Sequence, residues 1–194
     1  MPEPLAFAAM NDPPPPPYPV ELETHSPRWR TMAAEESARL KAALGELLVT
    51  VHHIGSTAIP GIVAKPIVDL MPVVRGDTAL DAAEAPVRAL GYRWYGEYGL
   101  AGRRYCTLSD AVSGKRLFQL HIYAPNAVHL PRHLAFRDYL LAHPGTAKEY
   151  EAEKLRAAAV APHDTNAYND EKNEFIARVE RQAVSWWATR PPAP

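Results

Sequence analysis

The stretch that decides the fold of this chain reads HHIGSTAIPGIVAKPIVDLMPVV and runs from His52 to Val74. A predicted strand ends at a Gly55–Ser56 turn, and a second apolar strand follows that carries one carboxylate, Asp69. A Gly-Ser turn leaving a strand presents backbone N–H groups and a hydroxyl to an anion. A carboxylate on the adjacent strand holds the cation that accompanies a phosphate. The stretch therefore predicts a phosphate or metal site.

Composition limits the class of protein. The chain has 194 residues, of which 47% are apolar, and this suits one well-buried domain. We expect a disordered Pro-rich leader over residues 1–18, a single domain over 19–189 and a tail over 190–194. The formal net charge of −1 gives no overall field that recruits nucleic acid or an anionic membrane.

The compartment follows from two further features of the sequence. One cysteine, Cys106, excludes an internal disulfide framework and suits a reducing cytosol. No window approaches the roughly 20 apolar residues that a membrane helix needs. We therefore expect a cytoplasmic protein with no membrane partner and no clear nucleic-acid partner, whose oligomeric state the sequence leaves open.

The order of predicted elements indicates an α/β (α+β) fold. Ser26 and Pro27 predict the start of a helix that ends near Gly45. Strands are predicted over 47–54, 67–74, 92–95, 103–108 and 117–123, and helices over 79–90, 131–141, 144–159 and 166–189, the first of them kinked or delayed by Pro86. We expect one mixed sheet of about five strands with flanking helices and a helical C-terminal section.

Several motifs together resemble the GrpB family. They are Val51–Asp69, Ser26–Trp29, Gly102–Tyr105, Leu120–Tyr123, Arg132–Leu140, and Tyr168 with Lys172 and Phe175, in the order of the family and over about 20–184. The resemblance implies a nucleotidyltransferase-like fold, the core of the polymerase β superfamily, in a family whose biochemical role is mostly undefined. It also implies a site around Gly55–Ser56, Asp69 and His121.

The metal chemistry of that site is where this sequence departs from the superfamily pattern. The usual device is a pair of carboxylates at alternate strand positions, which hold two divalent cations. Here the alternate position is Met71, which ligates hard cations poorly, and the position matching a third acid offers His121. Asp69 with His121 would hold Mg²⁺ weakly, whereas Asp69, His121 and His53 together suit Mn²⁺, Zn²⁺ or Ni²⁺ better.

Basic residues from separate segments are predicted to surround a phosphate. Lys65 precedes the second strand, and Arg104, Arg132 and Lys172 come from three later segments. Each candidate also has a structural reading. In that reading, Ser56 only caps a turn, and Lys65 is either a solvated lysine or the ion-pair partner of Asp69. His53 and His121 are then hydrogen-bonded histidines of the core.

Three functions are consistent with these residues. The first is an enzyme that moves a nucleotidyl or phosphoryl group from a nucleoside triphosphate to a small acceptor, with Ser56 and Lys65 at the phosphates and Asp69 and His121 at a divalent metal. The second is a catalytically lapsed module that binds a nucleotide or another anion, which Met71 favours. The third is a different small-molecule enzyme with a histidine-based metal site.

Overall fold

The structure is a computed structural model that describes residues 17–190. Its elements are α1 (Arg28–Leu44), η1 (Gly45–Leu47), β1 (Leu48–Ile54), η2 (Ser56–Ala58), β2 (Val68–Val74), α2 (Asp77–Ala82), α3 (Glu84–Ala89), β3 (Arg93–Trp94), β4 (Arg103–Ser109), β5 (Arg116–Tyr123), α4 (His129–Ala142), α5 (Pro144–Val160) and α6 (Thr165–Ala188). Residues 1–16 of the predicted leader and 191–194 of the predicted tail lie outside the described residues, whereas Pro17 and Tyr18 lie within them.

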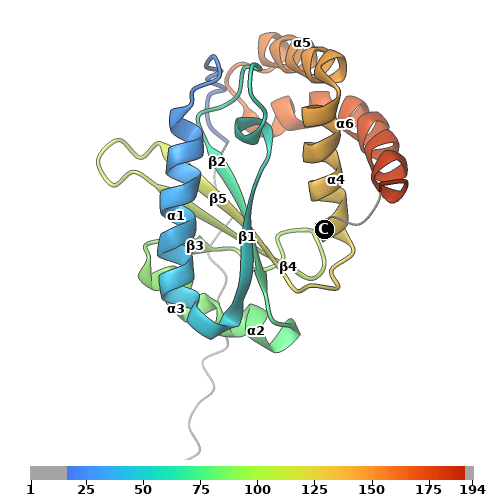
Figure 1. Cartoon of the computed structure of the whole chain (residues 1–194). Helices are drawn as coiled ribbons and strands as arrows, with labels where there is room; N and C mark the ends of the chain where they lie inside the picture. The colour runs from blue at the N-terminus through green and yellow to red at the C-terminus, as the bar shows by residue number, and fades with distance from the viewer. Residues whose placement is uncertain (1–16, 191–194) are drawn as a thin grey trace, which may run out of the picture.

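Within residues 17–190, five strands form one mixed sheet in the order β1-β2-β5-β4-β3. β2 runs parallel to β5, and the other neighbouring pairs are antiparallel. The helical C-terminal section follows as α4, α5 and α6 (Figure 1). The predicted architecture is therefore confirmed.

Helices cover both faces of this sheet, and the alternation of side chains along the strands explains why (Figure 1). Val68 and Leu70 of β2 pack in a large core with Trp29 and Leu40 of α1. Met71, which points to the other face, packs instead in a smaller cluster together with residues that lead into α4. Asp69 lies on this second face, so the site forms between the sheet and the C-terminal helices.

The boundaries of some elements differ from the prediction. The helix predicted over 79–90 is two short helices that meet at Ala83, and Pro86 lies in the first turn of the second, where its missing N–H breaks no helical hydrogen bond. The strand predicted over 92–95 is only Arg93–Trp94. The first helix begins after Pro27, and α4 begins at His129. Among the described helices, none has the combined length and apolar character needed to span a membrane.

Candidate anion-binding site

The turn after β1 lies directly against the carboxylate of β2. Ile54 is the register partner of Asp69, and Gly55 follows it with a φ of 70°. A Cβ atom on Gly55 would lie 2.5 Å from Oδ2 and 3.1 Å from Cβ of Asp69, so the carboxylate would have to move to make room for it. Glycine is therefore required here for two reasons, the left-handed backbone and the close approach of the carboxylate.

Asp69 forms a pair with His121 of the neighbouring strand. The Nε2 atom of His121 lies 3.5 Å from Oδ1 of Asp69. The other ring nitrogen, Nδ1, is buried and has no hydrogen-bond partner among the described residues. The centroid of its ring lies 5.5 Å from that of Tyr105 and 5.5 Å from that of His133. The imidazole is thus held behind the carboxylate, on the side away from the Gly55 turn.

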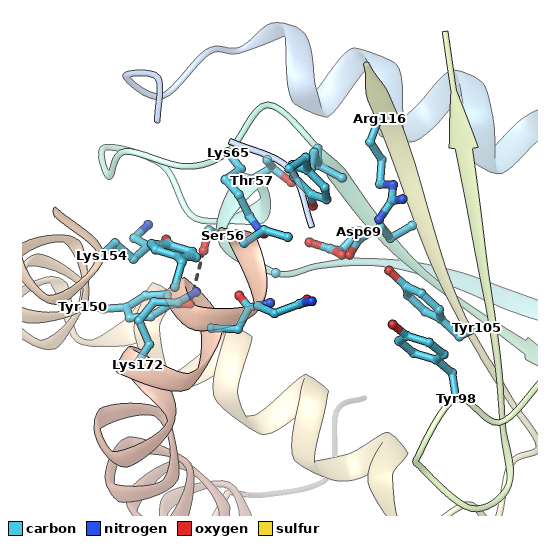
Figure 2. A pocket seen from close by; sticks show the side chains of 18 residues that line it. Ser56, Thr57, Lys65, Asp69, Tyr98, Tyr105, Arg116, Tyr150, Lys154 and Lys172 are labelled. Carbon is cyan, nitrogen blue, oxygen red and sulfur yellow. Dashed lines mark hydrogen bonds between the residues drawn. The ribbon is translucent and has the colours of Figure 1, made fainter. Parts of the chain in front are cut away.

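A cavity of about 240 Å³ opens in front of Asp69, and we call it the cationic cavity. Figure 2 shows that the sheet contributes Asp69 and Tyr105, whereas the helices contribute Tyr150, Lys154 and Lys172. The lining residues are Tyr18, Gly55, Ser56, Thr57, Lys65, Ile67, Asp69, Tyr98, Tyr105, Arg116, Gln119, Tyr150, Lys154, Thr165, Asn166, Tyr168, Asn169 and Lys172.

Positive charge dominates this lining. Lys65, Arg116, Lys154 and Lys172 face one carboxylate, that of Asp69, among the lining residues that the structure describes. Two of these cations, Lys154 and Lys172, are buried, and such an excess of positive charge is costly unless an anion compensates it. The charge balance of the cavity therefore favours a ligand with several negative charges.

The lysines are held by aromatic rings and neutral oxygens. Lys65 donates a hydrogen bond of 3.1 Å to Oγ1 of Thr165, and Lys154 donates to the carbonyl oxygen of Val63. The Nζ atom of Lys172 lies 3.8 Å from the centroid of the Tyr168 ring, and that of Lys65 lies 5.2 Å from the same ring. Tyr168 thus fixes two of the ammonium groups at the cavity without neutralising either.

Burial weakens the protonation of the two helix lysines. It lowers the pKa of Lys154 to about 7, and it lowers the pKa of Lys172 to about 7 with the help of repulsion from Lys65 and Lys154. Both side chains are almost fully buried, at 1% and 6% exposure. A bound anion would raise both pKa values, because it stabilises the charged form of each amine.

The hydroxyl of Ser56 lies at the helix side of the cavity. Its Oγ donates a hydrogen bond of 3.4 Å to the phenol oxygen of Tyr150, an interaction drawn as a dashed line in Figure 2. Ser56 therefore bridges the turn after β1 and α5, which places the turn and the lysine-bearing helix around the same space. Whether it also contacts a ligand stays a prediction.

The described residues do not fit a centre with two divalent cations. Among residues 17–190 there is no group of three or more His, Cys, Asp and Glu side chains placed to hold a metal ion. Asp69 and His121 supply one carboxylate and one imidazole. His53 instead shares a hydrogen bond of 2.9 Å with Oγ1 of Thr57, and burial lowers its pKa to about 4.

Met71 occupies the position at which the superfamily pattern has a second carboxylate. Its side chain is fully buried and packs with Ile54 and Tyr123, beneath Leu130 and Leu134. This part of the sheet face is closed by α4, so a carboxylate at position 71 would lie in an apolar cluster. The position belongs to the core of this protein.

Two of the predicted phosphate ligands lie outside the cationic cavity. Arg104 donates hydrogen bonds of 2.9 and 2.6 Å to Oδ1 of Asp81. It alternates with Tyr105 along β4 and therefore points to the opposite face of the sheet. Arg132 donates a hydrogen bond of 3.2 Å to Oε1 of Glu180. By contrast, Gly55, Ser56, Lys65, Asp69 and Lys172 all line the cavity, and His121 contacts it through Asp69.

Several lining residues were not anticipated from the sequence. Lys154 sits in the sequence Glu-Ala-Glu-Lys, which is typical of an exposed helix face, and only the packing of α5 against the turn reveals its burial. Arg116 begins β5 beside a turn and has the pattern of a surface residue. Gln119 could have been found, because it lies two residues from His121 and strand alternation places both on one face.

Comparison with known proteins gives a consistent result. The family model described as GrpB protein matches residues 19–182. The UPF0157 protein YqkA of Bacillus subtilis is 40% identical over 167 residues, which is 86% of this chain and 48% of YqkA. The chain thus spans about half the length of that relative.

Two further relatives match over most of their own length. The glutamate-rich protein GrpB of Alkalihalophilus pseudofirmus is 30% identical over 162 residues, which cover 82% of this chain and 93% of that protein. The crystal structure of the conserved protein GrpB from Enterococcus faecalis has a TM-score of 0.80 at 34% identity, with 87% of this chain and 99% of that chain covered.

Proposed function

The chain belongs to the GrpB family, and we propose that it binds the phosphate groups of a nucleoside triphosphate in the cationic cavity and transfers a nucleotidyl or phosphoryl group to a small acceptor. The observation that carries this proposal is the convergence of three lysines and an arginine on a cavity whose described lining holds one carboxylate. Phosphoryl transfer between oxygens needs mainly positioning and neutralisation of negative charge. In this proposal the lining side chains supply both.

The residues take separate roles in this proposal. Lys65, Lys172 and their cationic neighbours hold the phosphates and stabilise the negative charge that grows as the bond to the leaving phosphate breaks. The acceptor oxygen forms the new bond to phosphorus, and its proton passes to the carboxylate of Asp69. His121, 3.5 Å behind that carboxylate, is a positioning residue.

A divalent metal stays a prediction in this proposal. One carboxylate and one imidazole do not make a two-cation centre, and Met71 is part of the core. We therefore assign no step of the transfer to a metal held by the protein. Calorimetric titrations with Mg²⁺, Mn²⁺, Zn²⁺ and Ni²⁺ would measure which ion, if any, the Asp69–His121 pair binds.

The test separates binding from turnover. Calorimetry with ATP should show binding that Lys172→Met weakens by at least about tenfold, because a cation at the phosphates is lost. Lys41→Met, at an exposed position of α1, is the matched control and should leave the affinity unchanged. Chromatography of reactions with ATP and a panel of small hydroxyl compounds should show products that Asp69→Asn abolishes while ATP binding persists.

Two results would contradict the proposal, one for binding and one for turnover. If ATP does not bind, or if Lys172→Met binds it as tightly as the Lys41→Met control, the cationic cavity is not the phosphate site. If Asp69→Asn keeps full turnover on an identified acceptor, the carboxylate does not take the acceptor proton.

Met71 favours a second candidate, a non-catalytic module that binds a nucleotide or another anion. The same cavity would serve, but without a second acid there would be no transfer. In that case ATP would bind as described above, no acceptor in the panel would yield a product, and divalent metals would change the affinity little.

A further inference from the structure

The cationic cavity is too small for a whole nucleotide. Its volume of about 240 Å³ is below the roughly 300–1,000 Å³ that sites for small organic ligands occupy. The charged groups around it are matched to phosphates, so the organic part of a phosphorylated ligand must lie elsewhere. A second space next to this cavity is needed.

Such a space lies next to the cationic cavity, toward the edge of the sheet that β3 forms. A second cavity of about 510 Å³ shares Tyr18, Lys65, Ile67 and Arg116 with the first. Its remaining lining residues are Pro19, Glu21, Pro66, Arg93, Tyr95, Thr107, Ser109, Ser113, Gly114 and Lys115. Because they share these lining residues, the two cavities adjoin each other, and we call the shared residues the common wall.

The chemistry of the second cavity differs from that of the first. Pro66, Ile67 and Tyr95 give it apolar and aromatic walls, and the hydroxyls of Tyr95 and Thr107 lie 3.3 Å apart and satisfy each other. At its rim the exposed side chain of Lys115 is paired at 2.7 Å with Glu21. Two of its cationic side chains, Lys65 and Arg116, are shared with the cationic cavity, and a third, Arg93, is exposed at the sheet edge. The second cavity therefore suits a weakly polar group that is attached to phosphate.

Tyr18 is part of the common wall. Its ring centroid lies 5.5 Å from Nζ of Lys65 and 5.1 Å from the guanidinium carbon of Arg116. Its carbonyl oxygen accepts a hydrogen bond of 3.1 Å from the backbone N–H of Thr165, and Val20 donates one of 2.8 Å to Pro162. These bonds hold an aromatic ring at the boundary between the two spaces, where the phosphate end and the organic end of a ligand would meet.

We propose that the two cavities form one bipartite site, in which the cationic cavity holds the phosphates of a ligand and the second cavity holds its flat, weakly polar organic part. This inference rests on the proposed function, because it requires that phosphates bind beside Lys65 and Arg116. It goes further in assigning a place and a chemical character to the rest of the ligand.

The test compares ATP with inorganic tripolyphosphate by calorimetry. The wild-type protein should bind ATP at least about tenfold more tightly than tripolyphosphate. Ser109→Trp, which fills the second cavity from an exposed strand position, should remove this advantage and leave tripolyphosphate affinity unchanged. Val112→Trp is the control, because Val112 lies on the same hairpin, is 96% exposed and lines neither cavity.

The outcomes separate the two proposals. Tripolyphosphate binding with no advantage for ATP, or an advantage that survives in Ser109→Trp, overturns the bipartite site alone. Equal weakening of both ligands by Ser109→Trp also overturns it, since the substitution would then act through Arg116. Failure of both ligands to bind overturns the proposed function and this inference together.

Discussion

Gly55 and Asp69 approach so closely that a Cβ atom on Gly55 would lie 2.5 Å from Oδ2 of the carboxylate. Gly55→Ala should therefore destabilise the protein by more than the about 1–2 kcal/mol that a left-handed backbone alone costs an L-residue. It should also displace Asp69 and abolish turnover. Urea denaturation and the product assay measure the two effects.

Gly61→Ala is the matched control for that substitution. Gly61 has a φ of 79°, and a Cβ atom there would meet nothing within 4 Å. Its cost should be limited to backbone strain, with activity retained. If both variants lose the same stability and keep the same activity, the contact between the turn and the carboxylate is not needed.

The buried lysines predict a stability that rises with pH. In the unfolded chain Lys154 and Lys172 titrate near their ordinary pKa of 10.5, whereas burial lowers both pKa values to about 7 in the folded protein. Between about pH 7 and 10 the unfolded state therefore binds more protons, and the free energy of unfolding should increase by at most about 1.4 kcal/mol per pH unit for each lysine. Urea denaturation of the ligand-free protein at pH 7, 8 and 9 measures this slope.

Lys172→Met isolates the contribution of one of these amines. The variant should be more stable than the wild type at pH 7, because a buried ammonium is removed, and its stability should rise less steeply with pH. Lys41→Met should leave the slope as it is in the wild type. An unchanged slope in Lys172→Met would show that this lysine keeps its ordinary protonation in the folded state.

Restoring an acid at position 71 should fail to create a metal site. Met71→Asp places a carboxylate in a cluster with Ile54 and Tyr123, so we expect a loss of about 3 kcal/mol or more and no gain in Mg²⁺ binding. Met71→Leu, which conserves volume, should cost less than about 1.5 kcal/mol. Denaturation and metal titration test both. A stable Met71→Asp protein that binds Mg²⁺ would show that the cluster opens.

Substitutions of Arg116 and Arg104 should differ in their effect on tripolyphosphate affinity. Arg116→Gln should weaken tripolyphosphate binding by about tenfold, because Arg116 lines the cationic cavity. Arg104→Gln should change the affinity less than about twofold, because this guanidinium is paired with Asp81 outside the cavity. Calorimetric titration of both variants with tripolyphosphate measures this difference in affinity. Equal losses would mean that Arg104 moves to the ligand on binding.

The cap of α6 illustrates which parts of the fold follow from local chemistry. Asp164 accepts hydrogen bonds of 2.8 and 3.2 Å from the N–H groups of Asn166 and Ala167, which is the local capping geometry that an aspartate before a helix favours. The two strands around the Gly55 turn were also predictable, since apolar runs bounded by glycine have few alternatives. An interruption of the helix over 79–90 was predicted from Pro86, but its position at Ala83 was not, because that depends on how two short helices pack against α1 and the sheet.

The sequence by itself determined the family, the mixed sheet and the position of Asp69 beside the Gly55 turn, since motif order, hydrophobic period and glycine conformation are local properties. The tertiary structure alone decided the charge of the cavity. Lys154 has the appearance of a surface lysine until α5 folds back over the sheet, and Arg104 was predicted as a ligand although its guanidinium pairs with Asp81 outside the cavity. Which long side chains share a space depends on contacts between residues far apart in the chain, and no local pattern encodes these contacts.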